Sequence, residues 1–99
     1  MLSNVKMAKI TVKFYSLWAL YLNRNSISLE ANTFDAAMGK LEALFGEQLR
    51  KKLNQKNVQF VNLKDSSTIL VNGVSLRNVK NMQLKDGDLV QIFPPIAGG

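Results

Sequence analysis

Residues 33–53 most strongly constrain how this chain can fold, because they form the one long stretch with a clear helical period. Thr33 stands where an N-cap residue would, and Asp35 falls in the first turn. Behind them, apolar residues recur at helical spacing, at Phe34, Ala37, Met38, Leu41, Leu44 and Phe45. A helix that covers a sheet needs such a stripe, so Met38 and Phe45 are interpreted as core residues rather than as a ligand pocket.

Gly46 leaves two alternatives open for the second half of this segment. Glycine is a poor helix former, so it either ends the helix or only bends it. Leu49 and Leu53 continue the apolar pattern, which predicts a second short helix over residues 47–53 if the first one stops.

Strand patterns lie before this helix. Residues 9–15 alternate, with Ile10, Val12 and Phe14 on one side, which is typical of a half-buried strand. Residues 26–31 alternate again and are predicted to pair with the first strand as a hairpin. Residues 16–25 are densely apolar but fit neither period, so we predict a loop that packs aromatic residues over the core.

More strands are predicted after the helix. Residues 55–67 are polar with a few apolar residues embedded, which leaves an extra strand and a long surface loop as alternatives. Residues 68–71 form a strand that meets a tight turn at Asn72-Gly73, and 74–76 begin the return strand. Residues 84–88 form the next turn and 89–93 the last strand, which Pro94-Pro95 ends.

This order predicts an α+β domain in which one main helix packs across a mixed sheet of four to five strands. If the first and last strands are neighbours in the sheet, the chain leaves from a rigid base. We expect residues 1–99 to form a single domain, with 1–7 flexible and 94–99 an extended C-terminal tail.

The sequence contains neither cysteine nor histidine. Disulfides, thiolate nucleophiles, zinc fingers and histidine-based acid/base catalysis are therefore excluded. Asp86 and Asp88 are the only close carboxylate pair, and because they flank Gly87 they indicate a turn rather than a metal or acid/base site. No serine, threonine or lysine has a recognisable activating partner. The chain is not predicted to be a self-sufficient enzyme, and no metal site is expected.

The net charge of +6 raises the question of a nucleic-acid partner. The dense basic cluster is Arg50, Lys51, Lys52 and Lys56, at the end of the helical pattern, where cations complement the helix dipole. No aromatic residue is interleaved with it, so docking to an acidic protein surface is favoured over nucleic acid. No apolar stretch is long enough for a membrane span or a signal peptide, and a cytoplasmic location is expected. Met7 is an alternative start.

The ending at Gly98-Gly99 makes the terminal carboxylate the best candidate for chemistry. Glycine lacks a Cβ, so a diglycine end can enter a narrow channel and another molecule can approach its backbone closely. Taken alone, the two glycines are equally compatible with a frayed terminus.

Three stretches resemble a known family: residues 70–73, residues 84–90, and the ending from Phe93 to Gly99. Together they are similar to the ubiquitin-like β-grasp sulfur carriers, most closely the small subunits of molybdopterin synthase. The resemblance is strong over about the last thirty residues and looser over residues 9–45. The double proline before the diglycine is its most specific part.

The resemblance implies a carrier whose Gly99 carboxylate is adenylated by a separate ATP-dependent activating enzyme of the ubiquitin-activating type and then converted to a thiocarboxylate. The carrier itself binds no cofactor. The large synthase subunit would take the tail into its active site. Gly98 would be the second residue of the narrow tail, and partners would grip Phe93, Pro94, Pro95, Ile96 and Ala97.

The chain departs from the family pattern in two places. Many relatives carry a basic residue near Trp18-Ala19, and most are shorter through residues 51–67. Several functions therefore stay open beside molybdopterin synthesis. They are a sulfur carrier for thiamine, tungsten cofactor or tRNA thiolation, a ubiquitin-like modifier joined to lysines, and a basic nucleic-acid-binding module.

Overall fold

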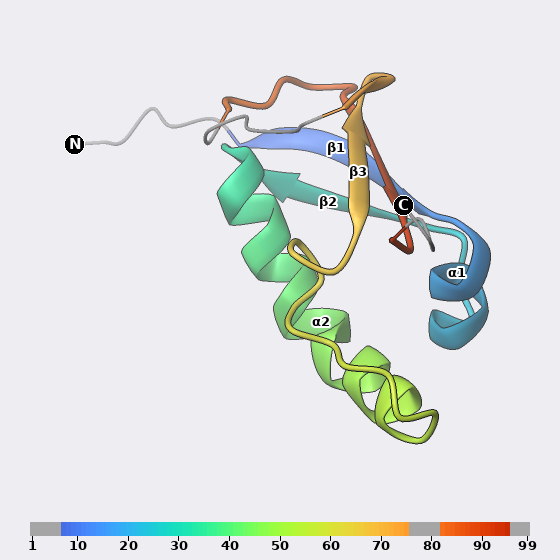
Figure 1. The fold of residues 1–99 in the computed structure, drawn as a ribbon. Coiled ribbons are helices and arrows are strands. Elements are labelled where there is room, and N and C mark those ends of the chain that lie inside the picture. Colours follow the sequence, from blue (N-terminus) through green and yellow to red (C-terminus); the bar gives the residue numbers. More distant parts are fainter. Residues whose placement is uncertain (1–6, 76–81, 96–99) are drawn as a thin grey trace.

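The computed structural model describes residues 7–75 and 82–95, so the predictions for residues 1–6, Leu76 and 96–99 lie outside the described residues. Its elements are β1 (Ala8–Phe14), α1 (Ser16–Leu22), β2 (Ser26–Ala31), α2 (Phe34–Asn54), β3 (Thr68–Val71), β4 (Val74–Ser75) and β5 (Leu89–Phe93). The strands form one five-stranded sheet in the order β2-β1-β5-β3-β4, with α2 beside it (Figure 1). The predicted α+β arrangement is confirmed.

The first and last strands are neighbours, as expected from the sequence. β1 and β5 pair in parallel, from Thr11 opposite Leu89 to Phe14 opposite Ile92. β2 pairs with β1 as the predicted antiparallel hairpin, and β3 pairs antiparallel with the other side of β5. β5 is therefore hydrogen-bonded on both sides.

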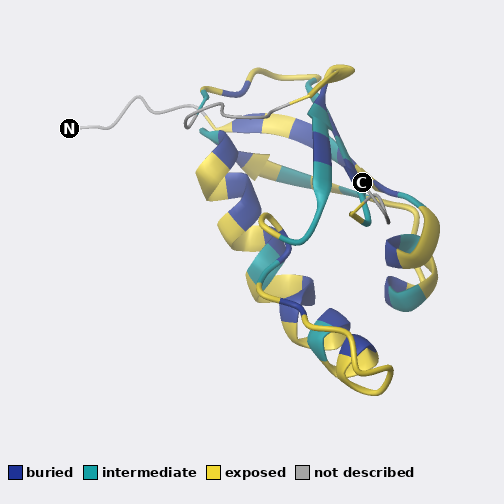
Figure 2. Cartoon of the chain, in the orientation of Figure 1, coloured by how far each residue is buried: buried dark blue, intermediate teal, exposed yellow. Residues whose placement is uncertain are grey.

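The core lies between this sheet and α2 (Figure 2). Strand alternation turns Val12 and Ile92, both fully buried, toward the helix. Met38 and Phe45 are buried on α2, and the Phe45 ring meets Phe14 edge-on at 5.4 Å between centroids, which confirms their assignment to the core. Leu44, however, is 57% exposed, because it lies about 100° around the helix from the centre of the buried face.

Residues 16–25 do not form the predicted loop, because Ser16–Leu22 is the helix α1. Two turns are too short to establish a period, and the apolar residues lie on both sides of this helix: Trp18 and Leu22 are buried, whereas Leu17 and Leu20 are exposed. The predicted aromatic packing is present. Trp18 Nε1 donates to Ser67 Oγ at 2.8 Å, and the Trp18 ring packs edge-on against Phe60.

Gly46 does not end the helix, and no second helix begins at residue 47, because α2 runs unbroken from Phe34 to Asn54. Thr33 is its N-cap, with Oγ1 accepting from the Ala36 amide at 3.2 Å. A Cβ at Gly46 would lie 2.1 Å from Glu42 Oε2. The missing side chain therefore leaves room for the Glu42 carboxylate against the helix.

Residues 55–67 form a long loop, so the alternative of an extra strand is wrong. Phe60 and Leu63 are nevertheless buried, and the loop is tied to α2. Glu42 Oε1 accepts from the Leu63 amide at 2.8 Å, and Arg50 Nη2 donates to the Val61 carbonyl at 3.1 Å. Hydrogen bonding to Glu47, and secondarily to Glu42, raises the pKa of Arg50 above its ordinary value.

The predicted turns are confirmed. Asn72 and Gly73 have φ of 52° and 84°, and Asn72 Oδ1 accepts from the Leu89 amide at 2.9 Å. Asp86 Oδ1 accepts from the Lys9 amide at 2.7 Å, and Asp88 Oδ2 from the Lys85 amide at 2.8 Å. Both carboxylates thus hold backbone at the turn.

Candidate functional site at the root of the tail

The tail root, as we call it, consists of Phe93, the last residue of the central strand β5, and the two residues after it, Pro94 and Pro95. The end of β5 is held by hydrogen bonds on both sides. Ile92 is fully buried and its carbonyl accepts from the Tyr15 amide at 3.1 Å, while Phe93 is paired with Thr68 of β3. Proline has no N–H for a strand ladder, so the sheet hydrogen bonding stops here.

An aromatic pair orients Phe93 on the outer face of the sheet. The Tyr15 ring stacks on Phe93 at 4.3 Å between centroids, with 14° between the planes. Gln91 Nε2 donates to the Tyr15 hydroxyl at 2.8 Å, which holds the tyrosine in this position. Stacked rings of this kind add attraction beyond their buried area, so the Phe93 side chain has a defined orientation.

A groove of about 530 Å³ lies beside this pair, lined by Ser16, Leu17, Thr68, Leu70, Phe93, Pro94 and Pro95. Thr68, Leu70 and Phe93 alternate with buried strand residues, so the groove is on the sheet face opposite α2. No lining residue is charged. The groove can therefore accept apolar side chains of another protein next to the point where the tail leaves.

The structure brings three predicted site residues, Phe93, Pro94 and Pro95, to this groove, whereas Ile96, Ala97, Gly98 and Gly99 lie outside the described residues. The other lining residues, Ser16, Leu17, Thr68 and Leu70, are not among the predicted site residues. Leu70 carries a detectable signal, because it is apolar at a strand position that alternates with the core. Leu17 carries none, because the sequence of residues 16–25 has no clear period.

Within residues 7–75 and 82–95, no three Asp or Glu residues gather in a way that could hold a metal ion.

Lys13 stands opposite Gln91 in the β1–β5 register, which places it on the same outer face as Phe93. In the same ranges, no helix is long and apolar enough to cross a membrane.

Comparison with known proteins identifies the family. The model of the ThiS family matches residues 22–99, which include α2, every strand after it and the diglycine end. The chain belongs to the ThiS family. The resemblance to β-grasp sulfur carriers is thereby confirmed. A search of curated proteins finds no significant match.

Solved structures share the fold of this ThiS-family chain over nearly its whole length. Small archaeal modifier protein 1 from Methanosarcina acetivorans is 23% identical, covers 96% of this chain and 100% of its own, and has a TM-score of 0.69. The Haloferax volcanii protein of the same name is 18% identical over 93% and 100%, with a TM-score of 0.65. A candidate molybdopterin converting factor, subunit 1, from Pyrococcus furiosus is 23% identical over 90% and 99%, at 0.52. These similarities confirm the β-grasp fold.

Proposed function

We propose that this protein is a carrier whose Gly99 carboxylate is activated by a separate ATP-dependent adenylating enzyme and then converted to a thiocarboxylate. The observation that carries the proposal is the apolar groove at the tail root. The tail root is attached to β5, a strand paired on both sides, and Gly98-Gly99 follows it within a few residues. Membership of the ThiS family supports it.

The chemistry requires little of this chain beyond its terminal carboxylate. A carboxylate is a poor electrophile, so one of its oxygens first attacks the α-phosphate of ATP and releases pyrophosphate. A sulfur nucleophile supplied by partner proteins then displaces AMP, which leaves sulfur on the Gly99 carbonyl. The chain has no cysteine or histidine, and we propose that it binds no cofactor and that its partners supply ATP and all catalytic side chains.

The residues before the diglycine would bind the partner enzymes. Partners would hold Phe93, Pro94, Pro95, Ile96 and Ala97, and the groove would receive an apolar side chain of the partner between Leu17 and Leu70. Gly98 has no side chain to obstruct a narrow active-site channel. The groove thus positions the carrier while the diglycine reaches the reaction centre.

For the fate of the sulfur, we propose molybdopterin synthesis, with the large synthase subunit as acceptor, because the chain ends in Phe93-Pro94-Pro95 before its diglycine. Protein modification is the second candidate, since two of the similar structures are small archaeal modifier proteins. Thiamine, tungsten-cofactor and tRNA thiolation are further destinations. All begin with adenylation of Gly99.

The first test is ATP–pyrophosphate exchange by the adenylating enzyme with the full chain as substrate. Deleting Gly99, or adding one residue after it, should abolish exchange and leave the thermal midpoint nearly unchanged, because a terminal residue buries little. Leu17→Asp should raise the KM for the carrier by about tenfold with kcat retained, since it charges the groove. Val61→Asp, at an exposed position outside the groove, is the matched control. Exchange that survives loss of Gly99 would refute the proposal.

The second test separates the destinations by intact mass of the protein isolated from cells. A thiocarboxylate adds about 16 Da, because sulfur replaces oxygen. Lysine-linked conjugates that require Gly99, without this mass, would instead favour the modifier. Transfer of the sulfur to a reconstituted large synthase subunit would then assign the molybdopterin branch.

A further inference from the structure

Positive charge in excess of the acidic residues gathers around the C-terminal half of α2, where Glu47 is already paired with Arg50. In the described residues, the ion pairs join Arg50 to Glu42 and Glu47, and Lys64 to Asp35. Asp65 and Asp88 accept hydrogen bonds within their own turns, and Asp86 accepts one from the Lys9 amide of β1. Over residues 7–75 and 82–95, the other cations have no ion pair; Lys9, Lys13, Lys40 and Lys85 lie elsewhere, whereas Arg24, Lys51, Lys52 and Lys56 lie close to α1 and the C-terminal half of α2.

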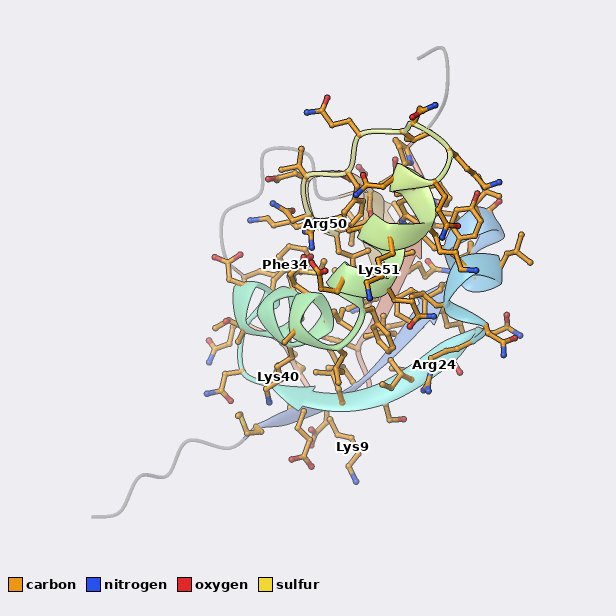
Figure 3. The ribbon with its side chains drawn as sticks, turned by 90° about the horizontal axis from the view of Figure 1, so that it is seen from below. Lys9, Arg24, Phe34, Lys40, Arg50 and Lys51 are labelled. Carbon is orange, nitrogen blue, oxygen red and sulfur yellow. The ribbon has the colours of Figure 1, made fainter. Side chains whose placement is uncertain are left out.

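Lys51 and Lys52 lie on α2, Lys56 lies in the turn after it, and Arg24 follows α1, which contacts α2. Gln48 Nε2 of α2 donates to the Tyr21 carbonyl of α1 at 3.1 Å, and the Arg24 guanidinium lies 5.5 Å from the centre of the Phe45 ring. Lys51 and Lys52 follow Gln48 by three and four residues, so they extend the same side of α2 by one turn. Figure 3 labels Arg24, just after α1, and Lys51, on the C-terminal half of α2.

Two exposed leucines are close in sequence to the residues that make this contact. Leu20 immediately precedes Tyr21 and is 69% exposed, and Leu44 precedes Gln48 by one helical turn and is 57% exposed. We call the combined surface the basic face, defined by Leu20, Arg24, Leu44, Lys51, Lys52 and Lys56. An apolar centre with charged neighbours is the usual composition of a protein-binding patch.

Favourable interaction with the helix dipole would account for only two of these cations, Lys51 and Lys52, which lie in the last turn of α2. It leaves Arg24, on another element, and the exposed leucines unexplained. A nucleic-acid surface would need exposed rings on which bases stack. Of the rings at this site, Phe45 is 8% exposed and lies beneath Arg24, and Tyr21 is partly buried against the core.

We propose that the basic face is a second interaction surface, separate from the tail root, that binds an acidic amphipathic segment of another protein. Leucine-like side chains of the partner would pack on Leu20 and Leu44, while its carboxylates would pair with Arg24, Lys51 and Lys52. The inference is independent of the carrier chemistry, since none of these residues lines the groove.

The test is a titration of the full-length protein with a fluorescent helical peptide of about 18 residues, or five turns, bearing leucines on one face and glutamates on the other. Saturable binding is expected, and it should weaken about tenfold when NaCl is raised from about 0.05 to 0.3 M. Amide NMR shifts should change around Leu20, Arg24, Leu44 and Lys52 and stay unchanged at Phe93.

A matched pair of variants separates the basic face from net charge. Lys51→Glu with Lys52→Glu should weaken binding about tenfold, whereas Lys9→Glu with Lys85→Glu, an equal charge change at other sites, should alter it less than about twofold. Leu44→Ser, at an exposed position that does not threaten folding, should weaken binding about threefold. Deleting Gly99 should change nothing.

Three results would overturn the inference. Failure to saturate at about 1 mM peptide would exclude a useful site. Equal losses in the two charge variants, or no loss in Leu44→Ser, would reduce the effect to net charge. Tighter binding of an oligonucleotide of matched charge, with the same NMR shifts, would assign the basic face to nucleic acid instead.

Discussion

The Glu42 carboxylate attaches the 55–67 loop to α2. It has room to do so because residue 46 is a glycine and has no Cβ. The carboxylate accepts from the Leu63 amide and from Arg50, at 2.8 and 3.2 Å. A Cβ at residue 46 would collide with it, so the end of the Glu42 side chain would have to shift, and we expect this to weaken its contacts with Leu63 and Arg50. A glycine inside a helix costs about 1 kcal/mol relative to alanine, whereas hydrogen bonds to a charged group stabilise by about 1.5–3 kcal/mol. The glycine is thus a net gain for the fold.

We therefore predict that the effect of Gly46→Ala on the free energy of unfolding has opposite signs in the presence and in the absence of the Glu42 side chain. In the natural chain, the substitution should lower the free energy of unfolding by about 1 kcal/mol, because the lost Glu42 contacts outweigh the gain in helix propensity. In a Glu42→Ala background, the same substitution should raise it by about 1 kcal/mol, since the obstruction is gone. Urea unfolding of the four proteins measures both values. Equal effects in the two backgrounds would disprove the coupling.

Among the elements, the 55–67 loop behaves as part of the core although it contains no strand. Leu63 is fully buried and Phe60 is 7% exposed, between α2 and Trp18 of α1. Arg50 closes the loop over α2, with its guanidinium 5.4 Å from the centre of the Phe60 ring. The 55–67 loop therefore adds packed surface around the C-terminal half of α2.

We expect Leu63→Ala to destabilise the protein by about 3 kcal/mol, as for any buried leucine in a helix or strand, because a cavity would open against α2. Val61→Ala is the control in the same loop: Val61 is 59% exposed, and its loss should cost no more than about 0.5 kcal/mol. Thermal or urea unfolding gives both values. A loss below about 1 kcal/mol for Leu63→Ala would mean that the loop packs only loosely.

Elements that carry a period could be predicted from the sequence, and those that depend on distant partners could not. β1, β2, β5 and α2 repeat every second or every third to fourth residue, which local sequence reveals. α1 has two turns with apolar residues on both sides, so only its packing between β5 and α2 separates Trp18 from Leu17. The loop is fixed by Glu42, 21 residues from Leu63. The groove was missed for the same reason, because Leu17 and Leu70 meet Phe93 only in the folded sheet.

At the scale of the whole molecule, the topology turns the end of the chain into a rigid base. β5 is the last strand along the chain but lies in the middle of the sheet, between β1 and β3. The Ile92 carbonyl accepts from the Tyr15 amide, so the residue before the tail root is bonded to a segment close to the start of the chain. We therefore expect the end of β5 to lose its hydrogen bonds only when the whole sheet opens. The edge strand β4 has only two residues and one neighbouring strand, so we expect it to open more easily.

Hydrogen exchange can test this rigidity directly. The Tyr15 and Val90 amides are expected to exchange only through global unfolding, so their free energies of exchange should equal the unfolding free energy from urea, whereas the Ser75 amide at the sheet edge should exchange far faster. A variant lacking residues 96–99 should give the same values, since the base is held by β1 and β3 and not by the last four residues. If Tyr15 exchanged as fast as Ser75, the tail root would be a mobile segment. A partner would then have to order Phe93 and Pro94 on binding, and the cost of doing so would appear as weaker binding of the carrier.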